Sequence, residues 1–127
     1  MEKTFLVIGA VLGALAVAIG AFGAHGLKAM VTPDLLANFE TGARYHMYHA
    51  LAIVAVALVI ARYPAATLAP TAGWLFLAGI VLFSGGIYAW LFTAQTPFVQ
   101  IVPIGGSAWI VGWLLLAAGA WRFGQTA

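Results

Sequence analysis

Apolar residues form four long stretches that are separated by short, more polar connectors. The stretches cover residues 5–25, 41–62, 72–93 and 103–122. An α-helix needs about 20 consecutive, mostly apolar residues to cross the roughly 30 Å hydrocarbon core of a bilayer. Strands of a membrane barrel would instead alternate apolar and polar residues over segments of about 10 residues. The pattern therefore predicts an all-α integral membrane protein, a four-helix bundle that forms a single transmembrane domain over residues 1–127.

Composition supports a membrane environment. Hydrophobic residues make up 65% of the chain and charged residues 6%, whereas soluble domains average about 45–50% and about 25%. A domain of this size buries only about two-thirds of its extended surface, so the lipid bilayer must cover the rest. The five basic residues are scattered and form no nucleic-acid-binding patch. The absence of cysteine excludes disulfides and thiolate metal sites.

The connectors carry signals for helix ends. Thr32, Pro33 and Asp34 form a helix start, because Thr caps the free backbone N–H groups, Pro fits the first turn and Asp complements the helix dipole. We expect a short interfacial helix here that leads into the second span, with a bend at Gly42. Pro103 either opens the fourth span or kinks it. The connectors are short, so consecutive spans are expected to pack as antiparallel neighbours.

The distribution of basic residues predicts the orientation. One side of the membrane receives Lys3, Arg62 and Arg122, and the other receives Lys28 and Arg44. Positive charge accumulates on the cytoplasmic side, so both termini are expected in the cytoplasm, in a bacterial-type inner (plasma) membrane. The first apolar run resembles a secretory signal peptide, but it is longer than the usual apolar core of about 7–15 residues. We therefore expect it to be retained as a span.

Small residues recur at intervals that suit close helix contacts. Gly9 and Gly13 are four residues apart in the first span, and Gly105, Gly112 and Gly119 are seven apart in the fourth. Small residues let helix backbones approach closely within a membrane. We interpret these positions as packing seams within the chain. The same stripes would also serve a homo-oligomer or a larger membrane protein complex, and the sequence does not separate these alternatives.

The hydrogen-bonding side chains gather near one membrane face. His25 closes the first span and His49 lies in the early part of the second. Together with side chains from the third span they form a candidate polar cluster in the extracytoplasmic half: His25, Tyr45, His49, Ser84 and Tyr88. The simplest interpretation is structural. Hydrogen bonds between membrane helices stabilise a bundle by about 0.6 kcal/mol each.

Sharper chemical interpretations use the same residues. His46 and His49, with His25 and Glu40, offer imidazole and carboxylate ligands that suit Zn, Cu or Ni. Haem ligation by His25 and His49, with Arg44 near a propionate, is a further alternative. Histidine also titrates near physiological pH, but no ionisable side chain continues a proton path through the cytoplasmic halves of the spans. No other feature supports a cofactor, and we expect none.

Four motifs in order along the chain carry a family resemblance. They read Gly20-Ala21-Phe22-Gly23-Ala24-His25-Gly26-Leu27, Thr41-Gly42-x-x-Tyr45-x-x-x-His49-x-Leu51-Ala52, Leu82-Phe83-Ser84-Gly85-x-x-Tyr88 and Pro103-x-Gly105-Gly106-x-x-x-x-x-Gly112-Trp113. Their order and spacing resemble the domain-of-unknown-function 423 family, small four-span membrane proteins related to transmembrane protein 256. The resemblance implies an integral membrane protein without a named activity. His46 lies outside the family pattern, and Gly86 stands where relatives often have Ser.

The chain offers no recognisable catalytic set. It has no paired carboxylates, no serine beside a base at a familiar spacing and no phosphate-binding loop. We therefore expect it not to be an enzyme. The favoured prediction is an accessory or binding subunit whose polar cluster docks a partner or a lipid. The alternatives are a metal- or ligand-binding membrane protein that uses His25 and His49, and a small transporter that works as an oligomer.

Overall fold

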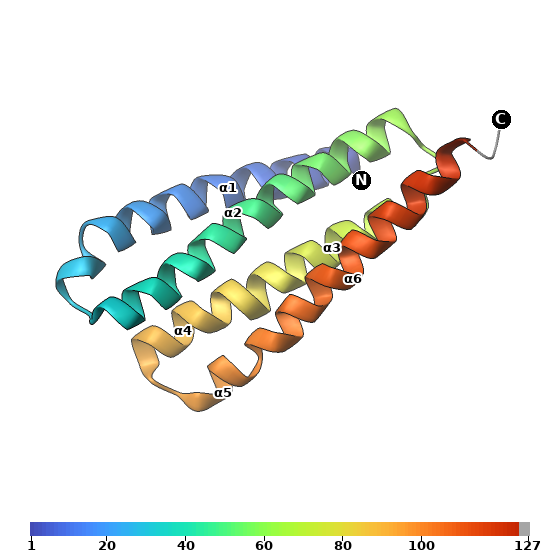
Figure 1. Ribbon diagram of the computed structural model, residues 1–127. Helices are drawn as coiled ribbons and strands as arrows, with labels where there is room; N and C mark the ends of the chain where they lie inside the picture. Colours follow the sequence, from blue (N-terminus) through green and yellow to red (C-terminus); the bar gives the residue numbers. More distant parts are fainter. Residues whose placement is uncertain (125–127) are drawn as a thin grey trace.

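The computed structural model describes residues 1–124, and within them the chain is helical with no strand. Four helical segments are long and apolar enough to cross a membrane: Glu2–Ala29, Pro33–Arg62, Ala69–Thr93 and Thr96–Trp121. The predicted all-α fold with four spans is thus confirmed. The helices run side by side along one common direction, and the start of the first and the end of the last lie at the same end of the molecule (Figure 1).

The first two spans form an antiparallel hairpin (Figure 1). Helix α1 (Glu2–Ala24) is followed by the short helix η1 (Leu27–Ala29) and then by α2 (Pro33–Arg62). The Thr32 side chain accepts a hydrogen bond from the Leu35 N–H at 3.4 Å, so α2 begins at the predicted cap. The segment that starts there is the beginning of α2 itself. It passes through Gly42 without interruption. The Tyr88 ring packs against the space that a side chain at Gly42 would fill.

The third span contains a wide turn. It consists of α3 (Ala69–Gly79), the π-helical segment η2 (Ile80–Ser84) and α4 (Gly85–Thr93). In η2 the Gly85 N–H bonds to the Ile80 carbonyl, five residues back instead of four. Such π-turns are rare and often occur at functional sites. Here the turn lies near the middle of the span and faces the helices that line the candidate site.

The fourth span begins after a second short helix. The connector contains α5 (Thr96–Gln100), which the sequence pattern does not predict. Helix α6 (Val102–Trp121) follows, and η3 (Arg122–Gly124) ends the described chain. Pro103 lies in the first turn of α6, so of the two sequence alternatives it opens the span.

The bundle is built from two hairpins that meet along α2 and α3. Helix α1 packs mainly on α2, and α6 packs mainly on α3 and η2, so α1 and α6 form the two outer sides (Figure 1). The core between them is rich in alanine and contains Phe5, Phe76 and Trp109 as its largest side chains. Most side chains of α1 and α6 are exposed, as expected for helices that face lipid.

Glycines bring the helices close together. A Cβ added at Gly9 would lie 2.7 Å from Val54 Cγ2 in α2. Added at Gly105 or Gly112, it would lie 2.5 Å from the Phe83 N or 2.8 Å from Phe76 Cε1. Gly119 makes an ordinary contact with Leu68 at 3.5 Å, whereas Gly13 has nothing within 4 Å. Three of the five glycines singled out in the sequence therefore face another helical segment of the same chain, Gly119 faces the connector before α3, and Gly13 faces neither.

Candidate functional site

A groove of about 840 Å³ runs along the side of the bundle between α2 and α6. Phe83 of η2 also contributes to its lining. The other lining residues come from the first half and the middle of α2 and of α6: Thr41, Tyr45, Tyr48, His49, Pro103, Gly106, Ser107, Trp109, Ile110 and Trp113. The groove is open on one side, where the hydrocarbon of the bilayer would meet it.

His49 is held at the inner wall of the groove by bonds to both ring nitrogens. Its Nδ1 lies 2.8 Å from the Tyr45 carbonyl oxygen, and the Trp113 Nε1–H donates to its Nε2 at 3.2 Å. A carbonyl only accepts and an indole N–H only donates. The neutral imidazole with its proton on Nδ1 is therefore the one form that satisfies both contacts. His49 is 5% exposed, so these contacts replace its contact with solvent.

Trp109 supports the imidazole from one face. The two rings are parallel, with centroids 3.8 Å apart and an interplanar angle of 2°. The indole is anchored in turn, because its Nε1–H donates to the Phe76 carbonyl at 3.1 Å. Gly79 of α3 lies directly against the indole, where any side chain would overlap it. Sequence analysis assigned no role to Trp109 and Trp113, although their four-residue spacing places them on one side of a helix.

A second polar cluster lies where α2 meets the third span. Ser84, fully buried, donates to the Gly42 carbonyl at 2.7 Å, and His46 Nδ1 lies 3.2 Å from the Tyr88 hydroxyl. The buried Nε2 of His46 has no hydrogen-bond partner within residues 1–124. These contacts tie α2 to η2 and α4.

The predicted cluster is thus divided. Tyr45 and His49 line the groove, Ser84 and Tyr88 lie in the second cluster, and His25 is exposed at the end of α1. Gly9 of α1 packs against Ala50, the residue after His49. His25 comes 16 residues after Gly9, about 24 Å farther along α1. His25 is therefore far from His49. His46 and His49 lie near the middle of the 30-residue helix α2, apart from His25, although the sequence grouped the histidines near one membrane face.

The structure does not assemble the proposed metal ligands. Within residues 1–124, no three His, Asp or Glu side chains are close enough to hold a metal ion. His25 and Glu40 are exposed near one end of the bundle, while His46 and His49 are buried at mid-depth. The same separation rules out haem ligation by His25 and His49 together. We therefore derive no metal or haem chemistry from these residues.

Comparison with known proteins shows which family this chain resembles. Residues 19–106 match the family model described as "Protein of unknown function (DUF423)". The chain is 41% identical over 121 residues to the UPF0382 membrane protein YwdK of Bacillus subtilis, an alignment that covers 95% of this chain and 98% of the relative. It is 39% identical over 122 residues to a UPF0382 membrane protein of Haemophilus influenzae, covering 96% and 97%. No solved structure matches the chain.

Proposed function

Because the chain belongs to the DUF423 family of bacterial membrane proteins, whose function is unknown, we propose that it is a membrane-embedded binding protein. It holds an uncharged lipid-phase molecule in the groove between α2 and α6. The observation that carries this proposal is the lining of the groove, in which exposed aromatic rings surround a fixed, neutral imidazole.

The charge of the groove restricts its ligand. None of the lining residues carries a formal charge, and His49 is held in its neutral form. A phosphate or carboxylate at this depth would remain unpaired, which is costly in a low-dielectric environment. The groove therefore favours an uncharged molecule, and its apolar walls favour one that partitions into the bilayer.

Two phenol groups supply the polar contacts. Tyr45 and Tyr48 are 40% and 52% exposed, and within residues 1–124 neither hydroxyl has a hydrogen-bond partner. The hydroxyls of Thr41 and Ser107 already donate to carbonyls of their own helices. A ligand with hydrogen-bond acceptors would therefore bond to Tyr45 or Tyr48, while its apolar part would lie along the half-exposed Trp113 ring.

The basic residues are divided unequally between the two ends of the bundle. Lys3, Arg62 and Arg122 belong to the end that holds both termini, and Lys28 and Arg44 belong to the opposite half. We infer that the termini face the cytoplasm of the bacterial cell. The groove then opens into the extracytoplasmic half of the membrane, where Thr41 and Pro103 lie at its outer end.

Filling the groove tests the proposal. A Cβ at Gly106 would make an ordinary contact of 3.7 Å with Phe83, so Gly106→Leu narrows the groove without a backbone collision. We expect mass spectrometry of extracts from purified wild-type protein to reveal an enriched uncharged lipid-phase compound. Extracts of Gly106→Leu should contain several-fold less of it.

Gly13→Leu is the matched control, because it adds the same side chain to an open position in α1. That variant should retain the compound. Identical extracts from all three proteins would contradict the proposal. Enrichment of a protein in place of a small molecule would favour the accessory-subunit alternative.

A further inference from the structure

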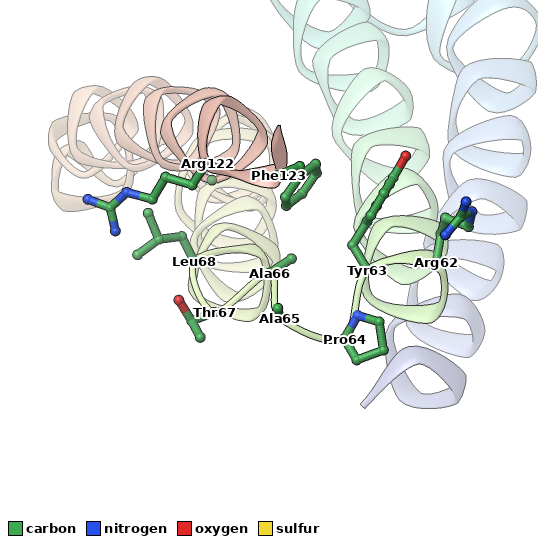
Figure 2. A pocket seen from close by; sticks show the side chains of 10 residues that line it. Arg62, Tyr63, Pro64, Ala65, Ala66, Thr67, Leu68, Arg122 and Phe123 are labelled. Carbon is green, nitrogen blue, oxygen red and sulfur yellow. The ribbon is translucent and has the colours of Figure 1, made fainter. Parts of the chain in front are cut away.

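A second pocket lies at the end of the bundle that holds both termini. It has a volume of about 400 Å³ and is formed between the connector from α2 to α3 and the end of α6 (Figure 2). Pro64, Ala66 and Leu68 give it an apolar floor. The rings of Tyr63 and Phe123, which also line it, stack on each other with centroids 4.4 Å apart and an interplanar angle of 17°. The stack links α2 to the last residues of the described chain.

Two arginines line this pocket from different helices. Arg62 is the last residue of α2, and Arg122 directly follows α6. Figure 2 shows their guanidinium groups on opposite sides of the stacked rings. The guanidinium carbon of Arg62 lies 5.0 Å from the centroid of the Tyr63 ring, within the range of a cation–π contact. The pocket is therefore flanked by positive charge on both sides.

No acidic side chain lines the pocket. The chain has three carboxylate side chains. Asp34 and Glu40 lie in the first turns of α2, at the far end of the bundle, and Glu2 contacts the N-terminal amine at 3.4 Å. Within residues 1–124 neither arginine forms a salt bridge. No carboxylate of this part of the chain therefore neutralises their charge.

The position along the helices indicates the source of that anion. Both α2 and α6 end here, directly after their apolar stretches. The ends of membrane helices lie at the level of the phospholipid headgroups. Basic pockets between helices on the cytoplasmic side are characteristic sites for anionic headgroups. The apolar floor and the stacked rings would then contact the glycerol and the first methylene groups of the lipid.

We propose that this pocket binds an anionic phospholipid that carries two phosphates joined by glycerol, as in cardiolipin. One phosphate pairs with Arg62 and the other with Arg122, because the two guanidinium groups lie on opposite sides of the stacked rings. A lipid with a single phosphate reaches one arginine at a time. This site is separate from the groove between α2 and α6 and does not depend on what that groove binds.

The test is a lipid titration of the purified full-length chain in mild detergent, followed by native mass spectrometry. We expect cardiolipin to bind more tightly than phosphatidylglycerol supplied at the same phosphate concentration, and phosphatidylcholine or free inorganic phosphate to bind little. Arg62→Gln and Arg122→Gln should each weaken cardiolipin binding about fivefold, since a basic residue near an anionic surface contributes about 1 kcal/mol.

Arg44→Gln is the matched control, because it removes one exposed positive charge in the other half of α2. It should leave cardiolipin binding unchanged. An equal loss in all three variants would show a general effect of net charge and would overturn the proposal, as would equal affinity for cardiolipin and phosphatidylcholine. Thermal unfolding without added lipid separates misfolded variants from variants that are folded but no longer bind.

Discussion

Gly79 provides the space that the indole of Trp109 occupies. A side chain at position 79 would overlap the ring, and the ring is fixed by its bond to the Phe76 carbonyl and by its parallel contact with His49. The inner wall of the groove therefore depends on a residue in α3 that does not line the groove.

We predict that Gly79→Ala destabilises the bundle and changes the groove, because overpacking a closely packed site costs about 1–3 kcal/mol. Gly13→Ala is the control: no atom lies within 4 Å of the added methyl group, and alanine favours a helix over glycine by up to about 1 kcal/mol. Thermal unfolding followed by circular dichroism in detergent should show a lower midpoint for Gly79→Ala and an equal or higher one for Gly13→Ala. Equal midpoints for both variants would contradict the packing described here.

Sequence reasoning identified Tyr45, His49, Ser84 and Tyr88 as polar residues of interest but could not assign their partners. Helical periodicity separates His46 from His49 by about 60°, which does not say which neighbour each one faces. That choice depends on how α6 and the third span pack against α2. Beyond its own helix, His49 contacts two tryptophans of α6, and a pattern of apolar residues gives no sign that an indole will donate to an imidazole.

Among the elements, the sequence predicted where α2 begins and ends, but it did not predict the π-helical turn η2 of the third span. Thr32 and Pro33 indicate a helix start through their capping chemistry, and the structure confirms it. The sequence of η2, Ile-Val-Leu-Phe-Ser, is as apolar as any helical turn nearby. His49 falls near the centre of α2 and away from its start, because the helix begins at Pro33, before the predicted span.

The surplus residue of η2 should be removable. A π-turn holds one more residue than an α-helical turn, so deletion of the exposed Val81 lets the turn close with little rotation of α3 against α4. Deletion of Leu114, equally exposed but within the regular helix α6, rotates the rest of that helix by about 100°. We expect the Val81 deletion to purify as a folded protein and the Leu114 deletion to lose most of its yield in size-exclusion chromatography. The reverse order would be incompatible with a surplus residue in η2.

For the whole molecule, the two hairpins place the α2–α3 connector at one end and the α4–α5 connector at the other (Figure 1). The chain has no cysteine, so single cysteines report on each end without background. Thr67 and Gln95 are exposed in the two connectors.

We predict that a membrane-impermeant maleimide labels Gln95→Cys in cells with an opened outer envelope, and labels Thr67→Cys only after the inner membrane is permeabilised. This outcome follows from the greater positive charge at the end that holds Thr67. Labelling of Thr67→Cys before the inner membrane is permeabilised would show the opposite orientation. The arginine pocket would then lie at the outer leaflet.

Helix α2 is a single unbroken rod of 30 residues, about 45 Å long, in a bilayer whose hydrocarbon core is about 30 Å thick. We expect its first turns, with Asp34 and Glu40, to extend into water, while the same helix carries Tyr45 and His49 within the membrane. Gly42 introduces no hinge between these parts. A tilt of the exposed turns would therefore also move the groove wall that Tyr45 and His49 contribute, relative to Trp109 and Trp113 on α6.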